Sequence, residues 1–424
     1  MSDTFEKYEL ADIDAQWEVS GEHNLIDFSV QEISMVESLL SPGLQTAIKV
    51  HSYKHIVPPK NFDAFKNIKV NIKISRQILE DYGFAEKSIQ FSPTIYRLAN
   101  RKNFGSSHND EEMIFYACHR SLLTNVQQLV SESFNGRTPD QVTEEIFSRM
   151  GIENTYIEPS YPMRDYMAEN IRPFEVLKQQ ADAALSYSGN DPSFVHFMTY
   201  ENGGTHYFRS LQEMSNENKN PVLRTKFGEA IFRPTGAGEA TRTKSDHFSG
   251  YKNPLSIMQY SFPCDFDLVT DLLNGVDLQG AIASAVAVID PFSREFFLKA
   301  VPFIGTVDAG QTFKFMMNNF NTANERESQR FGTENSILKR QARMNLLDPD
   351  KIALRMTVPW NPMLHAGKLI KVEFPNANRD DNNTLVNYGS GTYLISALVH
   401  TIKHGGYSTT TLDCVSSTVG AGIV

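Results

Sequence analysis

"SGTYLISALVHTIKHGGYSTTTLDCVSS", residues 390–417, has the pattern of two β-strands joined by a tight turn. Gly405 and Gly406 can adopt the positive φ angles that such a turn requires. The return strand is rich in threonine, as strands with one solvated face often are. Strict alternation would give the first strand two distinct faces. One face would carry Tyr393, Ile395, Ala397 and Val399, and the other Leu394, Leu398 and Ile402.

The first quarter of the chain shows the same two-residue period. Residues 44–51 and 68–74 alternate apolar and polar side chains, which predicts strands with one buried face. Residues 27–35, 88–100 and 113–119 are further strand candidates, and turn-forming residues separate them. Several short strands without a long helix indicate a small antiparallel barrel. More strands are predicted at residues 256–262, 281–289, 294–301, 352–358 and 369–374, and with the hairpin they indicate a second barrel.

Helices are expected between these two groups of strands. The tetrapeptide TPDQ at residues 138–141 has the capping-box pattern, with proline at the first helical position. A second helix is expected to begin near Pro173, and a hairpin turn is expected at the Asn-Gly-Gly of residues 202–204. Short helices are also predicted at residues 266–273 and 333–346. The middle of the chain therefore reads as a small α/β domain.

These patterns predict a mainly β fold with an α+β part: two antiparallel β-barrels, a small α/β domain and helical insertions. The first barrel would span residues 1–118 and the α/β domain residues 119–212. Residues 213–254 would form an irregular connection. The second barrel would be discontinuous, with residues 255–300 and 346–424 on either side of a helix-containing insertion at residues 301–345.

The composition is that of a globular protein with an acidic balance. Of 424 residues, 41% are hydrophobic and 21% are charged, and the formal net charge is −10. This charge argues against a protein whose main role is to grip nucleic acid, since phosphate binding needs a basic surface. The first residues are polar and acidic, unlike a signal peptide, and the most apolar stretch, residues 281–289, is too short to span a bilayer. We therefore expect a soluble protein that matures in the cytoplasm.

Cysteines and glycines give no sign of a metal or cofactor site. Cys118, Cys264 and Cys414 are odd in number and widely spaced, which argues against a disulfide framework or a zinc site. The Gly-Ala-Gly of residues 236–238 lacks the third glycine of a dinucleotide-binding loop and is expected to be an ordinary loop. The aromatic residues within 194–208 are expected to form core.

Histidines and carboxylates do not single out a catalytic site either. Two histidine pairs have a four-residue spacing: His51 with His55, and His400 with His404. In a strand this spacing separates side chains by about 13 Å, so polar-face positions are expected for all four. Glu201 and His206 flank the hairpin turn and are expected to be solvated. The sequence thus predicts no catalytic, cofactor-binding or metal-binding residue, and no enzyme.

Six segments carry a resemblance to a known family: residues 28–51 (FSVQEISMVESLLSPGLQTAIKVH), 172–185 (RPFEVLKQQADAAL), 194–214 (FVHFMTYENGGTHYFRSLQEM), 256–276 (SIMQYSFPCDFDLVTDLLNGV), 288–296 (VIDPFSREF) and 392–415 (TYLISALVHTIKHGGYSTTTLDCV). In this order they resemble the baseplate hub protein of T-even-like contractile-tailed bacteriophages. The likeness extends over roughly residues 25–417 and lies in packing and turn patterns.

The resemblance implies a structural protein of the virion with no cofactor. Members of that family are trimers with two tail-tube-like barrels in each chain, so that six barrels form a pseudo-hexameric ring. This ring joins the tail tube above to the central spike protein below, contacts adjacent baseplate proteins and lets phage DNA pass without specific binding. Such a protein would be assembled in the host cytoplasm, would lie in the tail baseplate and would not insert into a membrane.

Two alternatives stay open. One is the spike base of a contractile injection or secretion system, but those chains usually carry their needle, whereas this sequence ends at Val424 soon after the last hairpin. The other is a tail-associated cell-wall hydrolase. For the hub, the acidic balance predicts a neutral to acidic channel, with Lys69 and Lys73 pointing away from it.

Overall fold

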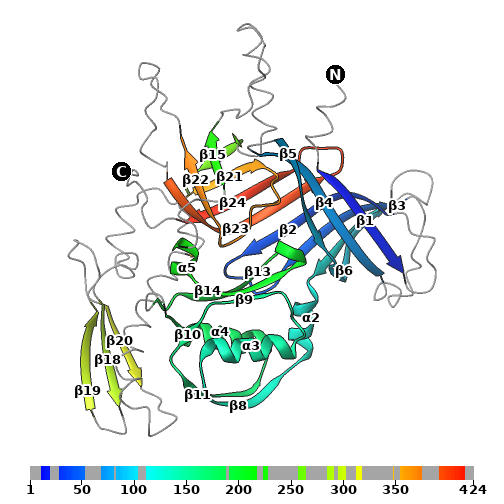
Figure 1. Cartoon of the computed structure of the whole chain (residues 1–424). Coiled ribbons are helices and arrows are strands. Elements are labelled where there is room, and N and C mark those ends of the chain that lie inside the picture. The colour runs from blue at the N-terminus through cyan, green and yellow to red at the C-terminus, as the bar shows by residue number, and fades with distance from the viewer. Residues whose placement is uncertain are drawn as a thin grey trace, which may run out of the picture.

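The computed structural model of the chain has a predominantly β architecture, which confirms a mainly β fold (Figure 1). The structure describes residues 11–19, 28–52, 68–80, 83–103, 111–187, 191–216, 223–227, 256–263, 284–290, 295–301, 312–317, 347, 354–374 and 391–415.

One sheet of 14 strands runs through both ends of the chain. Its path is β1-β4-β6-β7-β3-β2-β23-β22-β15-β16, with β5, β17, β21 and β24 attached. Its N-terminal strands are β1 (Asp12–Val19), β2 (Phe28–Ser38), β3 (Gln45–Ser52), β4 (Ile68–Glu80), β5 (Gly83–Phe91), β6 (Thr94–Asn103) and β7 (Glu111–Cys118). Its C-terminal strands are β15 (Leu223–Phe227), β16 (Ser256–Ile257), β17 (Gln259–Ser261), β21 (Leu354–Pro359), β22 (Leu369–Glu373), β23 (Gly391–Lys403) and β24 (Thr409–Val415).

Strands β1 to β7 curve around a shared hydrophobic core that includes Ile33, Ile72 and Phe115. Every second residue of β3 and β7 is buried, as the alternation predicted. β1 comes close to β2, but among the described residues no backbone pairing joins them. The described strands therefore form an open curved sheet, without the closed barrel that was expected.

Two details of this region differ from the sequence-based expectation. β1 was not predicted, although it pairs with β4 along its whole length. The strand expected at residues 88–100 is two strands, because β5 ends at Phe91 and β6 begins at Thr94. Pro93 lies between them and has no N–H to donate to a ladder.

The predicted hairpin near the end of the chain is present as β23 and β24. Gly405 in its turn has a φ of +64°. One edge of β23 pairs with β24. The other edge pairs with β22 at Gly391–Leu394 and then with β2 at Ala397–Lys403. β23 is thus the strand that joins the C-terminal part of the sheet to the N-terminal part.

A β-bulge in β23 overturns the predicted faces of this strand. Ile395 is opposite Cys414 and Ala397 is opposite Asp413, so Ser396 is an extra residue in the ladder. An extra residue reverses the alternation beyond it. After the bulge the buried residues are Leu398, His400 and Ile402, whereas Ala397 and Val399 are partly exposed. The grouping of Ala397 and Val399 with Tyr393 and Ile395 is therefore wrong.

Residues 119–216 contain the predicted helices and hairpin. The elements are α2 (Arg120–Gln127), β8 (Val130–Arg137), α3 (Pro139–Arg149), β9 (Thr155–Ile157), β10 (Ser160–Tyr161), β11 (Arg164–Ile171), α4 (Pro173–Ala183), β12 (Leu185–Ser186), β13 (Phe194–Thr199), the 3₁₀ turn η2 (Glu201–Gly203), β14 (Thr205–Ser210) and α5 (Leu211–Asn216). The capping pattern is confirmed, because the Thr138 N–H donates to Gln141 Oε1 at 3.2 Å.

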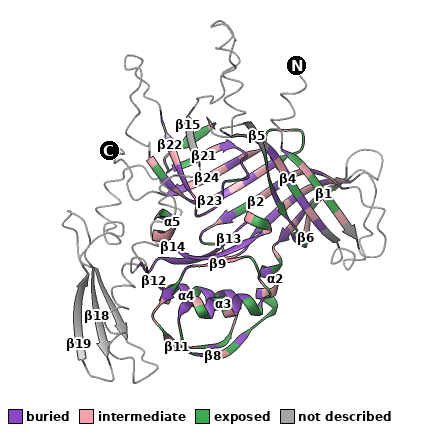
Figure 2. Cartoon of the chain, in the orientation of Figure 1, coloured by how far each residue is buried: buried purple, intermediate pink, exposed green. Residues whose placement is uncertain are grey.

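The sheet β13-β14-β9 lies between the helices and the large sheet (Figure 1). α3 and α4 pack on one of its faces, and the other faces β2. Because both faces are covered, every residue of β13 and β14 is buried (Figure 2). The aromatic residues of this hairpin are core, as expected.

A separate sheet contains β18 (Ser284–Asp290), β19 (Glu295–Val301) and β20 (Thr312–Met317). β18 and β19 are the strands expected at 281–289 and 294–301, but they pair with each other and β20 instead of joining the large sheet. The helices expected at 266–273 and 333–346 and the glycines at 236–238 lie outside the described residues. No helix in the described part of the chain is long and apolar enough to span a membrane.

Candidate functional site

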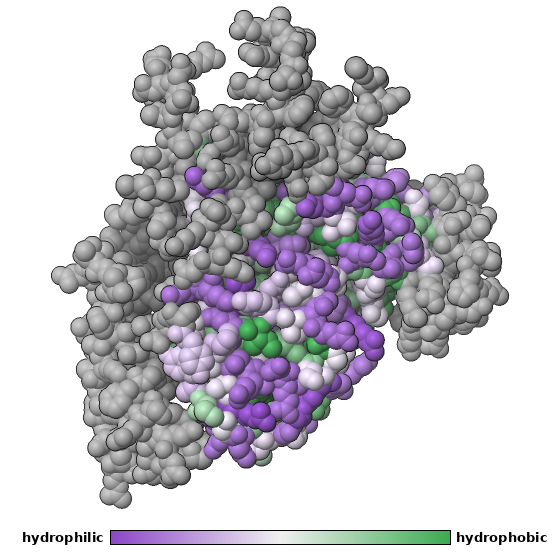
Figure 3. Space-filling model, viewed as in Figure 1, coloured by the Kyte–Doolittle hydropathy of each residue, from purple (hydrophilic) through white to green (hydrophobic). Residues whose placement is uncertain are grey.

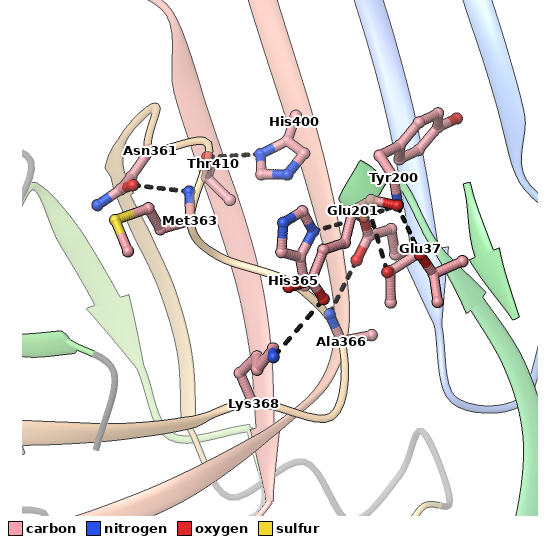
Figure 4. Close-up of polar contacts among 12 residues, drawn as sticks. Glu37, Tyr200, Glu201, Asn361, Met363, His365, Ala366, Lys368, His400 and Thr410 are labelled. Atoms are coloured by element: carbon pink, nitrogen blue, oxygen red, sulfur yellow. Dashed lines mark hydrogen bonds and ion pairs between the residues drawn. The ribbon is translucent and has the colours of Figure 1, made fainter. Parts of the chain in front are cut away.

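A fully buried carboxylate joins three distant parts of the chain (Figure 4). Glu37, near the end of β2, accepts the backbone N–H groups of Tyr200 and Ala366, each at 2.8 Å. The Nδ1 atom of His365 lies 3.0 Å from Glu37 Oε1. Tyr200 follows β13, and the other two residues lie in the loop between β21 and β22. We call this arrangement the Glu37 junction, because it ties the α/β region and that loop to β2.

The two ionisable groups of the junction stabilise each other's charged forms. Burial alone would raise the pKa of Glu37, but the charge and hydrogen bond of His365 and the Tyr200 N–H bring it below its usual value. Burial alone would lower the pKa of His365, but attraction to Glu37 raises it above its usual value. Both directions favour the ionic form of the pair, and loss of either partner from that form would leave a buried charge without compensation.

Further polar groups surround the junction (Figure 4). His400 is fully buried and its Nδ1 lies 2.8 Å from Thr410 Oγ1. Burial lowers the pKa of His400 to about 4, so this side chain is neutral at neutral pH. Lys368 Nζ is 3.6 Å from Glu201 Oε2, and the Tyr207 hydroxyl donates to the same oxygen at 2.5 Å.

A second polar feature is a chain of three histidines and a serine between α2 and the β13–β14 hairpin. His119 Nδ1 lies 2.8 Å from Ser121 Oγ, and that oxygen is 3.0 Å from His206 Nε2. His206 Nδ1 in turn lies 3.1 Å from His196 Nε2. Burial lowers the pKa of His119 to about 4 and that of His196 to about 3, and the pKa of His206 is also well below its usual value. All three rings are therefore neutral at neutral pH.

The hydrogen bonds of this histidine chain run in one direction. The Ser121 backbone N–H donates to His119 Nδ1 at 3.3 Å as a helix cap, so Nδ1 carries no proton. The Ser121 hydroxyl must then donate to His119, and His206 Nε2–H must donate to Ser121. His196 Nε2–H donates to His206 by the same logic. This leaves His196 Nδ1 as an unprotonated acceptor, and it is a buried ring nitrogen without a hydrogen-bond partner among the described residues.

A groove of about 870 Å³ opens beside the Glu37 junction. Its lining comes from β4 and β5, the start of α2, the η2 turn and the loop before β22. We call it the junction groove. Its polar and charged lining residues are Asn71, Lys87, Ser88, Gln90, Ser92, His119, Arg120, Glu201, Asn202, His365 and Lys368. No three His, Cys, Asp or Glu side chains of the described residues are arranged to hold a metal ion.

The structure separates the histidine pairs considered from sequence. His400 is buried, so its expected polar-face position is wrong, whereas His404 is exposed. The β-bulge explains this, because it turns His400 inward. His51 is half-buried, and His55 lies outside the described residues. His400 and His404 therefore lie in different environments, and their four-residue spacing does not place them in one site.

The other candidates also have definite environments. His206 is fully buried, so the expectation of a solvated turn is wrong for it, and Glu201 is half-buried with Lys368 and Tyr207 as partners. Cys118 and Cys414 are buried free thiols, and burial raises the pKa of Cys118 to about 11. Cys264 lies outside the described residues.

Sequence reasoning missed the Glu37 junction, although one signal for it was present. Glu37 follows Ile33 and Met35 with the strand period of two, and all three are buried. A carboxylate in register with a buried apolar face needs a partner in the interior. The identity of that partner could not be predicted from neighbouring residues, because His365 comes from the far end of the chain.

No protein-family profile and no curated protein sequence matches the chain. Solved structures do match its fold. A tail protein from Neisseria meningitidis MC58 is 11% identical, with a TM-score of 0.50 over 96% of this chain and 97% of that one. A 43 kDa tail protein of prophage MuSo2 from Shewanella oneidensis is 9% identical, with a TM-score of 0.50 over 95% of this chain and 97% of that one. A type VI secretion system component from E. coli is 10% identical, with a TM-score of 0.47 over 96% of this chain and 78% of that one.

Proposed function

We propose that this protein is a structural component of a contractile phage tail, and specifically the trimeric hub that joins the tail tube to the central spike. The observation that carries the proposal is the likeness in fold, along nearly the whole of each chain, to two tail proteins, one of them from a prophage. The likeness does not depend on a shared motif. It involves the overall arrangement of strands and helices.

The strand arrangement supports two barrel-like units in each chain. The first would be β1 to β7, which already curve around one core. The second would be the strands around the core that includes Leu354, Ile395 and Leu412. Two short strands, β16 and β17, are separated only by Met258. β16 pairs with β15 and β17 pairs with β21. The Met258 N–H donates to Thr357 O at 2.9 Å. Three such chains would supply six units to a ring of three-fold symmetry.

The charges on the sheets support a channel that does not hold DNA. Three cations on the sheets are paired with carboxylates on neighbouring strands: Lys49 with Glu112 at 3.0 Å, Lys73 with Glu86 at 3.4 Å, and Arg355 with Asp413 at 2.6 Å. Paired cations leave little net positive charge for phosphate groups to bind. The described surface on the face seen in Figure 3 is mainly hydrophilic.

The partners in this proposal are a central spike protein below the ring, tail tube subunits above it and adjacent baseplate proteins. No chemical step is assigned to the chain. Its work would be to hold subunits in place, with the Glu37 junction fixing the α/β region against the sheet.

The proposal is tested by the mass and symmetry of the purified chain. Native mass spectrometry should give a species three times the 47.8 kDa chain mass. Images along the symmetry axis should show six lobes around a central opening. A stable monomer that stays monomeric when the spike protein is added would overturn the hub assignment. A trimer whose axial view shows three lobes would agree with the predicted trimer but would overturn the two-barrel arrangement.

A further inference from the structure

The junction groove is positively charged in a protein that is acidic as a whole. Lys87, Arg120 and Lys368 line it, and Glu201 is the one carboxylate among its lining residues. That carboxylate is already engaged by Lys368 and Tyr207. The chain has a formal net charge of −10, so the groove lining differs in sign from the chain as a whole. A groove lined by one sign of charge concentrates the electric field and attracts ligands of the opposite sign.

Arg120 is the cation best placed to meet a ligand. It is exposed at the first position of α2 and lines the groove. Its guanidinium makes no hydrogen bond or ion pair with any side chain in the described part of the protein. A guanidinium presents several donors in one plane and can bind both oxygens of a carboxylate at once. The groove therefore offers a carboxylate receptor at one end.

One wall of the groove is an edge strand. Residues 87–91 of β5 line the groove, and β5 pairs with β4 over its whole length. Among the described strands, β5 has no strand neighbour on its other side, although the η2 turn contacts it at Gln90, whose carbonyl oxygen would lie 3.3 Å from a Cβ on Gly203. The edge of a sheet can accept an added strand through its backbone groups. The side-chain amides of Asn71, Gln90 and Asn202 are further lining groups that can hydrogen-bond a peptide backbone.

We propose that the junction groove is a docking site for an extended, acidic polypeptide segment of a partner chain. The segment would lie along β5, with a carboxylate on Arg120. The groove's volume of about 870 Å³ accommodates a few residues of such a segment. The proposal concerns a binding surface and does not depend on the number of subunits in the assembly.

Two other anionic ligands fit the groove less well. Duplex DNA needs a broad positive surface, and outside the groove the nearby Lys73 is already paired with Glu86 at 3.4 Å. A small inorganic anion would engage one or two cations and leave the amide groups and the strand edge unused. An extended acidic peptide uses all three kinds of lining group.

The test uses the full-length protein and a short, capped, fluorescent peptide of alternating glutamate and threonine. Fluorescence anisotropy should show binding of this peptide and no binding of the matched lysine–threonine peptide. Arg120→Glu should weaken binding about tenfold, the effect of losing one charge-assisted hydrogen bond. The control is Arg172→Glu, which makes the same charge change at another exposed arginine, the N-cap of α4. That variant should bind like the wild type.

A second readout locates the peptide. Hydrogen exchange of the β5 amides should slow when the peptide binds, whereas exchange in β8 should not change. Equal effects of Arg120→Glu and Arg172→Glu, or equal binding of the acidic and basic peptides, would overturn the proposal. Preferential binding of inorganic phosphate or of a DNA duplex, with the same dependence on Arg120, would show that the ligand class is wrong. None of these results depends on whether the chain forms a trimer.

Discussion

His365 and Glu37 are 328 positions apart in the sequence, yet His365 Nδ1 lies 3.0 Å from Glu37 Oε1. The contact is buried, and two backbone N–H groups also donate to the Glu37 carboxylate. Buried ion pairs contribute little net stability compared with an apolar pair of the same shape, but removing one partner is costly. The main effect of the pair is therefore to fix the position of the loop before β22 relative to β2.

Glu37→Gln should destabilise the protein by about 3 kcal/mol. The amide can accept through one oxygen only, and its NH₂ group would face a backbone N–H donor. Urea unfolding followed by circular dichroism should show a lower midpoint. The control is Glu32→Gln on the same strand, a half-buried position that should change stability by less than about 0.5 kcal/mol. Equal midpoints for the two variants would contradict a stabilising role of Glu37 in the contact between β2 and that loop.

The buried neutral histidines predict a loss of stability in mild acid. The pKa of His400 is about 4 in the folded protein against 6.5 for an unperturbed histidine, so between these values the unfolded state binds more protons. Stability should therefore fall as pH decreases from 6.5 towards 4, by about 1.4 kcal/mol for each unit of pKa difference. His400→Gln should reduce the change in Tm between pH 7 and pH 5. His404→Gln, at an exposed position of the same hairpin, should leave that change as it is in the wild type.

His365 should act in the opposite direction. Its pKa is raised in the folded state, so its contribution to stability is complete below pH 6.5 and is lost as pH rises through the folded value. The pKa of Glu37 is lowered, so its contribution is present above 4.5 and is lost in stronger acid. His365→Gln should therefore destabilise the protein more at pH 6 than at pH 9, as measured by urea unfolding. A larger loss at pH 9 would contradict the ionic form of the pair.

Ser121→Ala should destabilise the protein by about 1–3 kcal/mol, because His206 Nε2–H would then be a buried donor without an acceptor. Ser133→Ala removes an exposed hydroxyl that bonds only Asn135 and should be nearly neutral. Thermal unfolding compares the two variants. If both have the Tm of the wild type, the histidine chain does not hold α2 on the hairpin.

Alanine substitutions at three glycines distinguish the cost of backbone strain from the cost of steric overlap. Gly367 has a φ of +82°, and a Cβ there would lie 2.9 Å from Met214 Sδ and 3.0 Å from Phe197 Cζ. Gly405 has a φ of +64° with open space around it, and a Cβ on Gly391 would meet its nearest atom at 3.8 Å. Alanine should cost about 1 kcal/mol at Gly405, more than about 3 kcal/mol at Gly367 and little at Gly391. Urea midpoints in any other order would contradict the described backbone.

Duplex DNA should bind weakly to the assembled protein. A filter-binding measurement at about 50 mM salt, where charges are least screened, should give little retention. The reason is the pairing of sheet cations with carboxylates, as in Lys49 with Glu112. Glu112→Gln would free Lys49 and should increase retention if that surface faces the channel. Tight, salt-sensitive binding by the wild type would contradict the proposed channel.

Much of the fold follows from local sequence patterns. The helix starts at Pro139 and Pro173 and the hairpin turn at Gly405 were predicted, because caps and turns depend on neighbouring residues. β1 could have been predicted as well, since Ile13, Ala15 and Trp17 alternate with polar residues.

The faces of β23 and the Glu37 junction could not be derived in the same way. A single bulge at Ser396 changes which side chains of β23 are buried, and no residue type in the strand predicts that bulge. The junction needs the pairing of β2 with β23 and the position of the loop that carries His365. Both are long-range features, and a two-residue period gives no information about them.

The position of β2 also has a consequence for how the chain is made. Residues 28–36 of β2 pair with β3 on one side, and residues 32–38 pair with residues 397–403 of β23 on the other. A ribosome adds roughly 5–20 residues per second, so the second partner follows β2 after roughly 20–70 seconds. During that interval one edge of β2 has no native partner and is open to wrong pairings between nascent chains. Correct folding therefore cannot be completed before β23 leaves the ribosome, and conditions that slow translation should increase aggregation of this protein.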